Sequence, residues 1–228
     1  MTVRRFLLLA LLLPLAGCLD ARVAAFGDSV TFGWGGLPGG WVSEVSVLSG
    51  TPMADLGVPG ETTAGGAKRI NGPFGLWAAP FARTVIILEG GNDANGLAQH
   101  APCYGNCDPS VDEAQFEKIG DNLRSMRMVA AQFGRRVVFA TYWPPSRQAC
   151  SNLDDAGFAT WQAFLTRVNQ EIVTVAAEND DPVVHLDDLT DLPDFADNYF
   201  DCLHPSPLGY TRIALRWMED VEVWDPDL

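Results

Sequence analysis

Hydrophobic residues gather in short runs, and these runs alternate with stretches in which apolar residues recur every three or four positions. The clearest runs are residues 84–88 and 137–140, which are almost entirely apolar. Such a run favours a strand that is covered on both faces, as in a parallel sheet. Strands are predicted at residues 22–27, 52–57, 84–90, 136–143 and 182–187.

The intervening stretches have the spacing of amphipathic helices. One apolar stripe runs from Phe116 to Phe133 and a second from Trp161 to Val175, each in three- and four-residue steps. Further helices are predicted at residues 41–48, 62–70 and 206–221, and irregular segments at 90–111 and 142–156. Alternating strands and helices predict a single α/β domain with a parallel sheet and right-handed crossovers.

The composition and charge of the chain indicate which classes of partner it can bind. The chain has 228 residues, of which 47% are hydrophobic, and this is enough for one domain with a full core. Its formal charge of −14 and the lack of any basic stripe argue against nucleic acid as a partner.

The first residues have the pattern of an export signal. Arg4 and Arg5 precede an apolar stretch that is too short to span a membrane. The sequence Leu-Ala-Gly-Cys that ends at Cys18 resembles a bacterial lipobox. We expect residues 1–17 to be a signal peptide and residues 18–228 to be the mature domain, anchored in the cell envelope through a lipid on Cys18. Ordinary cleavage nearby would instead leave a soluble periplasmic or secreted protein.

Four further cysteines suit an oxidising compartment. We expect Cys103 to pair with Cys107 and Cys150 with Cys202, although the sequence leaves the other pairings open. A zinc site at His100, Cys103 and Cys107 is a weaker alternative, because their spacing lacks a CxxC pair. We therefore predict no metal site.

Polar residues follow the predicted strands. Because the carboxyl ends of parallel strands meet at one edge of a sheet, these residues are expected to converge there. They are Ser29 after the first strand, Gly60 after the second, Asn92 after the third, and Asp201 with His204 beyond the fifth.

This set of residues is suited to acyl transfer. A serine hydroxyl needs a base, and an imidazole oriented by a carboxylate supplies one, so we assign Ser29, His204 and Asp201 to these roles. The attacked carbonyl oxygen becomes an oxyanion that needs fixed donors. The backbone N–H groups of Ser29 and Gly60 and the amide of Asn92 can supply three.

The same segments resemble the signature blocks of the SGNH hydrolases, also called the GDSL esterase and lipase family. The blocks are "FGDSVTFG", "GVPGETT", "GGND" and "DCLHP", in the family's order between residues 26 and 205. The resemblance implies a three-layer α/β/α sandwich with a five-stranded, flavodoxin-like parallel sheet, and the roles already given to Ser29, Gly60, Asn92, Asp201 and His204. It also implies hydrolysis of carboxylic, thio- or acetyl esters through an acyl-enzyme, without a cofactor.

Two positions depart from the family pattern: Asp55 stands where the second block usually has asparagine, and Cys202 where the last often has glycine. Asp28 and Asp93 are expected to brace the site through backbone hydrogen bonds, and Glu89 to be solvated or to brace a loop. The alternative function is a non-catalytic envelope protein that binds glycans or lipids on the same fold.

Overall fold

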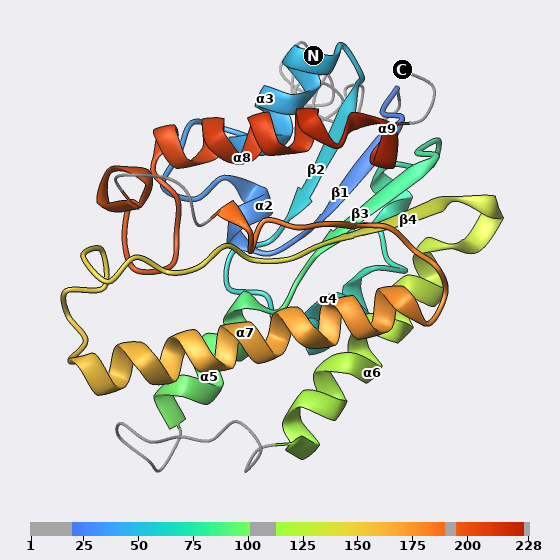
Figure 1. Cartoon of the computed structure of the whole chain (residues 1–228). Coiled ribbons are helices and arrows are strands. Elements are labelled where there is room, and N and C mark those ends of the chain that lie inside the picture. The colour runs from blue at the N-terminus through green and yellow to red at the C-terminus, as the bar shows by residue number, and fades with distance from the viewer. Residues whose placement is uncertain (1–19, 101–112, 190–194, 226–228) are drawn as a thin grey trace, which may run out of the picture.

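Five parallel strands form the centre of the molecule, in the order β2-β1-β3-β4-β5 (Figure 1). The computed structural model describes residues 20–100, 113–189 and 195–225. The strands are β1 (Val23–Gly27), β2 (Met53–Gly57), β3 (Thr84–Leu88), β4 (Arg136–Ala140) and β5 (Val183–Val184). The predicted α/β class and five-stranded parallel sheet are confirmed, and the strand order is the flavodoxin-like one.

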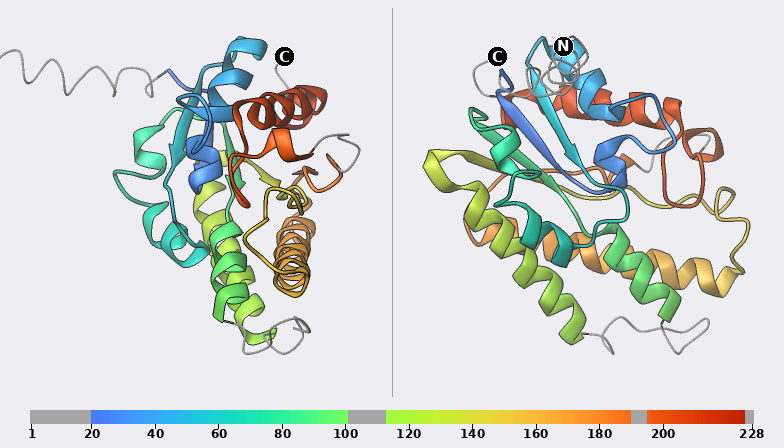
Figure 2. Two further views of the ribbon diagram at one scale, coloured as in Figure 1. Left: turned by 90° about the vertical axis from the view of Figure 1, so that its left-hand side faces the viewer. Right: turned by 180° about the vertical axis from the view of Figure 1, so that it is seen from behind.

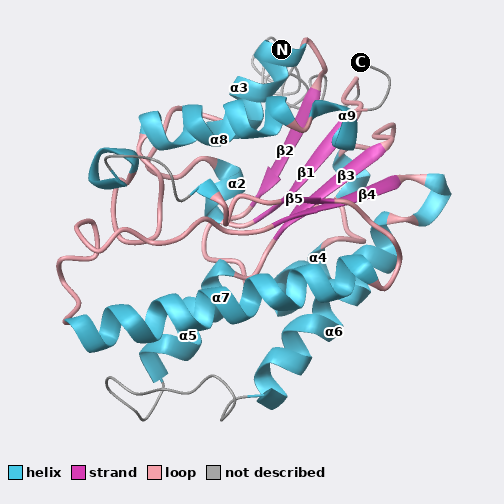
Figure 3. Cartoon of the chain, in the orientation of Figure 1, coloured by secondary structure: helices cyan, strands magenta, loops and turns pink. Residues whose placement is uncertain are grey.

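Helices cover both faces of this sheet (Figures 1 and 2). One face is covered by α3 (Gly40–Ser49) and α8 (Pro207–Glu219), which pack against each other. The other is covered by α4 (Thr63–Arg69), α5 (Gly91–His100), α6 (Glu113–Ala130) and α7 (Asp155–Ala177). Two short helices, α2 (Ser29–Phe32) and α9 (Val221–Trp224), follow β1 and α8, and 3₁₀ turns occur at Leu76–Ala78, Gln132–Gly134 and Phe195–Asn198 (Figure 3).

The core is formed where the predicted apolar stripes meet the sheet. Every residue of β1 and β3 is buried, as expected for strands covered on both faces. The stripe of α6 buries Phe116, Leu123 and Met126. Between α3 and α8, the rings of Trp41 and Trp217 stack with their centroids 4.7 Å apart.

Two predicted boundaries are wrong for identifiable reasons. Residues 91–100, predicted to be irregular, form α5, because contact with α7 stabilises a sequence whose glycines and polar residues disfavour an isolated helix. The last predicted strand, 182–187, shortens to two residues. Its continuation leaves the sheet because the N–H groups of Leu186 and Asp187 donate to the hydroxyl of Thr141, at 2.9 and 3.1 Å.

The strands share one register, and this gives the sheet two distinct edges. Val23 pairs with Met53 and with Thr84, and Thr84 pairs with Arg136, so four strands begin at the same level. We call this the amino edge, and the opposite side, where Gly27 lies beside Gly57 and Leu88, the carboxyl edge. Over the described ranges, no helix is both long and apolar enough to cross a bilayer.

Candidate active site

Ser29 lies at the carboxyl edge of the sheet, in the first turn of α2. Asp28 caps this helix, and its Oδ1 accepts a hydrogen bond of 2.9 Å from the N–H of Val30. A side chain at Gly27 would lie 2.4 Å from the carbonyl oxygen of Leu88, so only glycine lets the chain turn this closely past β3. The turn therefore holds Ser29 in a buried, fixed position, with 3% of its surface exposed.

A chain of hydrogen bonds joins Ser29 to His204 and Asp201. The Nε2 of His204 lies 2.9 Å from the Oγ of Ser29, and its Nδ1 lies 2.9 and 3.0 Å from the two carboxylate oxygens of Asp201. The structure thus brings together three residues that the sequence separates by 175 positions. In this arrangement the imidazole can accept the hydroxyl proton while the carboxylate fixes its tautomer.

The loop of Asp201 and His204 is tightly held. Asp201 Oδ1 also accepts hydrogen bonds from the backbone N–H groups of Leu203 and His204, at 2.8 and 2.7 Å. Burial opposes ionisation of Asp201, but the bonds from the His204 ring and from both N–H groups outweigh it and lower its pKa. Asp201 is therefore an ionised acceptor for the ring near neutral pH.

A disulfide fixes the same loop to the segment after β4. Cys150 and Cys202 are bonded, which confirms this predicted pair. Their Cα atoms are 4.4 Å apart and they close a separation of 52 residues. Cys202 lies next to Asp201, so the bond constrains the backbone that carries the carboxylate. The predicted Cys103–Cys107 pair and the candidate lipid attachment at Cys18 lie outside the described residues.

The loops after β2 and β3 carry the other candidate donors. Gly60 has a left-handed backbone with φ of +77°, and no atom lies within 4 Å of the position that a Cβ would occupy. One N–H of the Asn92 amide donates to the carbonyl oxygen of Glu61 at 2.8 Å, which leaves the second N–H for a substrate. Asp93 joins the two loops again, because it accepts hydrogen bonds from the N–H and the hydroxyl of Thr63, both at 2.8 Å.

Several carboxyl groups crowd this edge, and burial raises their pKa values. Desolvation raises the pKa of Asp28 to about 6, against hydrogen bonds from Tyr142 and Val30 that lower it. Burial also raises the pKa of Asp93 and that of Asp55, the latter to about 6. Glu89 is fully buried, and desolvation followed by repulsion from Asp28 holds its pKa well above the usual range. Burial therefore favours the protonated, neutral form of Glu89.

One residue that supports the site, Tyr142, is not singled out by the sequence pattern. The hydroxyl of Tyr142 donates to Asp28 Oδ2 at 2.7 Å, and its ring packs against Gly91, so it braces the loops after β1 and β3. Glu89 was expected to be solvated or to brace a loop, but it is fully buried, and it is near enough to Asp28 for the two carboxylates to repel each other. The sequence does contain a sign that Glu89 is buried, because this residue follows the apolar run of β3 without an intervening turn residue. Asp28 and Asp93 do brace backbone N–H groups as expected.

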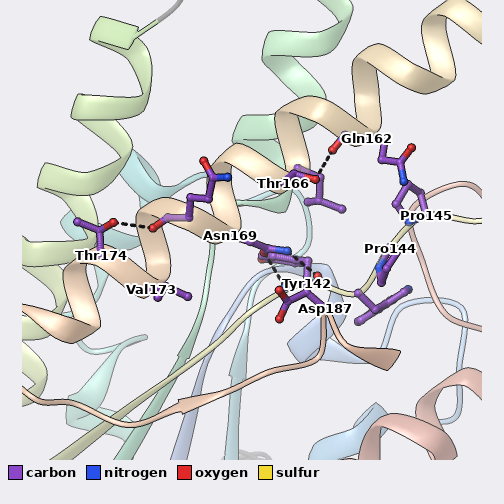
Figure 4. Close-up of a pocket in the computed structure, with 12 residues that line it drawn as sticks. Tyr142, Pro144, Pro145, Gln162, Thr166, Asn169, Val173, Thr174 and Asp187 are labelled. Carbon is purple, nitrogen blue, oxygen red and sulfur yellow. Dashed lines mark hydrogen bonds between the residues drawn. The ribbon is translucent and has the colours of Figure 1, made fainter. Parts of the chain in front are cut away.

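A cavity of about 520 Å³ opens beyond Tyr142, between the segment after β4 and α7 (Figure 4). Asn169 holds this segment to α7, because its amide exchanges hydrogen bonds of 2.7 and 2.8 Å with the backbone of Tyr142. Ser29 and His204 are not among the residues that line this cavity. We therefore distinguish it from the surface on which a reacting ester would lie.

Exposed aromatic side chains lie beside His204. The ring of Trp34 is 6.4 Å from the ring of His204, centroid to centroid, and 49% of Trp34 is exposed. Phe200 is also exposed and contacts Gly35 of the Trp34 loop. The hydroxyl of Tyr210 donates to the carbonyl oxygen of Trp34 at 2.9 Å and holds the loop in place. An apolar group bound here would lie next to the imidazole.

Within residues 20–100, 113–189 and 195–225, no three His, Cys, Asp or Glu side chains are placed to bind one metal ion. The zinc alternative at His100, Cys103 and Cys107 depends on cysteines outside these ranges.

Comparisons with known proteins identify the family and the fold of this chain. The model of the GDSL-like lipase/acylhydrolase family matches residues 25–212. A lipase/acylhydrolase from Enterococcus faecalis shares 20% identity with a TM-score of 0.62, over 89% of this chain and 95% of its own. A GDSL-like lipase from Bacteroides thetaiotaomicron shares 18% with a TM-score of 0.63, over 89% and 88%. A lipase from a goat rumen metagenome shares 15% with a TM-score of 0.69, over 90% and 99%. At these identities the solved structures show a common fold, and no curated protein matches the sequence.

Proposed function

This chain belongs to the GDSL-like lipase/acylhydrolase family and hydrolyses esters, and we propose that it does so with Ser29 as nucleophile, His204 as base and Asp201 as the group that orients the base. One observation carries the proposal: the hydrogen-bonded chain from Ser29 Oγ through both ring nitrogens of His204 to Asp201. Family membership favours this enzyme over a non-catalytic protein that binds glycans or lipids.

The proposed reaction has two halves. His204 Nε2 takes the hydroxyl proton while Ser29 Oγ attacks the ester carbonyl, and the imidazolium then protonates the departing alcohol or thiol. This leaves an acyl group on Ser29. His204 next takes a proton from water, the hydroxide attacks the acyl carbon, and the proton returns to Ser29 as the acid leaves. Asp201 stabilises the imidazolium in both halves.

The oxyanion that forms in each half needs donors that are already in place. We assign the N–H groups of Ser29 and Gly60 and the side-chain amide of Asn92 to this role. The bond from Asn92 to the carbonyl of Glu61 supports the assignment, because it fixes the amide and leaves one N–H free. The open space beside Gly60 supports it as well, because a substrate oxygen can approach the backbone there.

The substrates proposed are carboxylic, thio- or acetyl esters with an apolar or aromatic portion. The exposed rings of Trp34 and Phe200 beside His204 support this choice, because apolar surface at the site favours an apolar group. The signal-like residues 1–17 and Cys18 support export to the cell envelope, with the mature chain held there by a lipid.

Replacing the nucleophile tests the proposal. We expect Ser29→Ala to lower the hydrolysis of an aryl acetate at least about 10⁴-fold, with an unchanged melting temperature. Ser125→Ala on α6 is the matched control and should retain full activity. Ser29→Ala activity within a few-fold of the parent would show that the ester is cleaved elsewhere.

A further inference from the structure

A cluster of exposed aromatic side chains lies at the amino edge of the sheet, opposite the active site. Trp77 and Phe81 precede β3 and are 66% and 69% exposed, and Phe133 precedes β4 and is 91% exposed. Trp77, Phe81 and Phe133 line a common hollow of about 660 Å³. An exposed apolar surface of this kind usually marks an interaction site.

Phe133 is unusual in its backbone as well as in its exposure. Its φ is +64°, a left-handed conformation that is costly for a bulky side chain. The ring gains no burial in return, because it points into solvent. Within the chain, its neighbour is Arg135, whose guanidinium carbon lies 5.4 Å from the ring centroid. An aromatic ring held outward at this cost is explained by a partner outside the chain.

Hydrogen bonds made by arginine residues join the segments that carry the aromatic cluster. The Nε of Arg135 donates to the carbonyl oxygen of Ala82 at 3.1 Å, which joins the segment before β4 to the segment before β3. The N–H of Arg136 donates to Arg83 O at 2.8 Å, and the N–H of Arg83 donates to Arg22 O at 2.7 Å. The three segments therefore form one surface.

The segments that carry these aromatic rings are locally basic. Residues 20–22, 71–83 and 131–136 contain four arginines and only one carboxylate, Asp20, in a chain whose formal charge is −14. Exposed rings among cationic side chains are the composition that binds the interface of an anionic bilayer, where rings enter the headgroup layer and arginines meet lipid phosphates.

The start of the described chain lies at the same place. Arg22 precedes β1, and its carbonyl oxygen accepts a hydrogen bond from the backbone N–H of Arg83. The first described residues lie at the amino edge in both views (Figure 2). Only Leu19 separates Cys18 from Asp20, and two residues span at most about 7 Å. A lipid on Cys18 would therefore enter the bilayer beside Trp77, Phe81 and Phe133.

We propose that the amino edge, formed by Trp77, Phe81 and Phe133 with the arginines around them, is a membrane-docking surface that seats the protein on an anionic phospholipid bilayer. A lipid on Cys18 would tether only the end of the chain, and this surface supplies a second attachment that fixes the orientation of the domain. The strands rise roughly 15 Å from this edge to Ser29, so the docked protein holds its active site away from the bilayer. Taken with the proposed function, this orientation favours esters in the surrounding compartment over the lipids of the same membrane.

Fluorescence quenching by brominated lipids tests the orientation. Residues 19–228 carry an N-terminal histidine tag and are tethered to vesicles that contain nickel-chelating lipid, phosphatidylglycerol and brominated phosphatidylcholine. Unbrominated vesicles of the same composition give the reference intensity. We expect tryptophan emission to be quenched in the parent, and Trp77→Phe to remove most of this quenching. Trp34→Phe should leave it unchanged, because Trp34 lies at the opposite edge.

Variants of the surface distinguish contact between the aromatic rings and the bilayer from tethering of the chain through its tag alone. Phe81→Ser combined with Phe133→Ser should abolish most of the quenching of Trp77, whereas Leu215→Ser, an exposed apolar position on α8, should not. Omitting phosphatidylglycerol should weaken the quenching. The proposal is overturned if the tethered parent is not quenched, if quenching depends on Trp34 instead of Trp77, or if the Phe81/Phe133 variant behaves like Leu215→Ser. Each variant's melting temperature confirms that it is folded.

Discussion

At the scale of single residues, Asp28 shows how the site departs from the ordinary chemistry of a carboxyl group. It lies beside the candidate nucleophile, fully buried, with hydrogen bonds from Val30 and Tyr142. These bonds stabilise its ionised form less than burial destabilises it, so its pKa is raised to about 6. A group that holds the turn of Ser29 is therefore also a source of pH-dependent stability.

Replacing Asp28 with asparagine should flatten the stability profile between about pH 4 and pH 6. The folded protein keeps a proton on Asp28 up to about 6, whereas the unfolded chain releases it near 3.8. Because the folded state binds more protons in this window, the free energy of unfolding falls as pH rises, by about 3 kcal/mol for this group. Urea unfolding should show a smaller fall for Asp28→Asn. Asp121→Asn, an exposed control, should fall as the parent does, and an equally steep fall for Asp28→Asn would contradict the assignment.

A second residue-scale prediction concerns the tautomer of His204. In Asp201→Asn the amide oxygen can still accept from the N–H groups of Leu203 and His204, and the amide nitrogen then faces Nδ1. This places the ring proton on Nε2, where it can no longer accept from Ser29. We expect kcat to fall about 10³–10⁴-fold with little change in KM or melting temperature. A loss of less than tenfold would remove Asp201 from the mechanism.

At the scale of elements, the site depends on loops whose positions are fixed by few bonds. The Cys150–Cys202 disulfide connects the segment before α7 to the loop of Asp201. The loops after β2 and β3 are connected by the hydrogen bond that Asn92 donates to Glu61 and by the one that Asp93 accepts from Thr63. The register of the strands determines only where each loop leaves the sheet, and these bonds determine where the loop then lies.

Removing the disulfide should therefore lower both stability and activity. For a closed loop of this length, chain entropy predicts a loss of about 4 kcal/mol in the free energy of unfolding of the Cys150→Ser/Cys202→Ser variant. Activity at a temperature where this variant is still folded should also fall, because Asp201 loses its backbone restraint. Denaturant unfolding and kcat measure the two effects. Unchanged kcat in the folded variant would show that the bond stabilises the fold without positioning the carboxylate.

Elements with a strong pattern could be predicted from the sequence, and those decided by tertiary contact could not. The uninterrupted apolar runs located β1, β3 and β4, and the stripes located α6 and α7. The helix α5 was missed because its own residues disfavour helix and its packing on α7 decides. The end of β5 was missed because the hydroxyl of Thr141, not a neighbouring strand, satisfies the backbone there.

At the scale of the whole molecule, the two edges of one sheet separate two surfaces with different chemistry. The carboxyl edge gathers carboxylates, an imidazole and a serine, whereas the amino edge exposes aromatic rings among arginines. The first grouping was predictable, because each of its residues closely follows a strand or lies in a recognisable block. The second was not, because Trp77, Phe133 and Arg22 are distant in sequence and meet only through the register of the strands. Tyr142 was missed for a similar reason, since its partner Asp28 follows another strand.

Covalent labelling by a fluorophosphonate probe tests the central claim most directly, because the probe reacts only with a serine that a base has activated. The native protein is labelled, digested and mapped by mass spectrometry, with Ser29→Ala and heat-unfolded protein as controls. We expect one label for each chain, on the peptide that contains Ser29, and none in either control. Labelling of a different serine, or no labelling of folded and active protein, would contradict it.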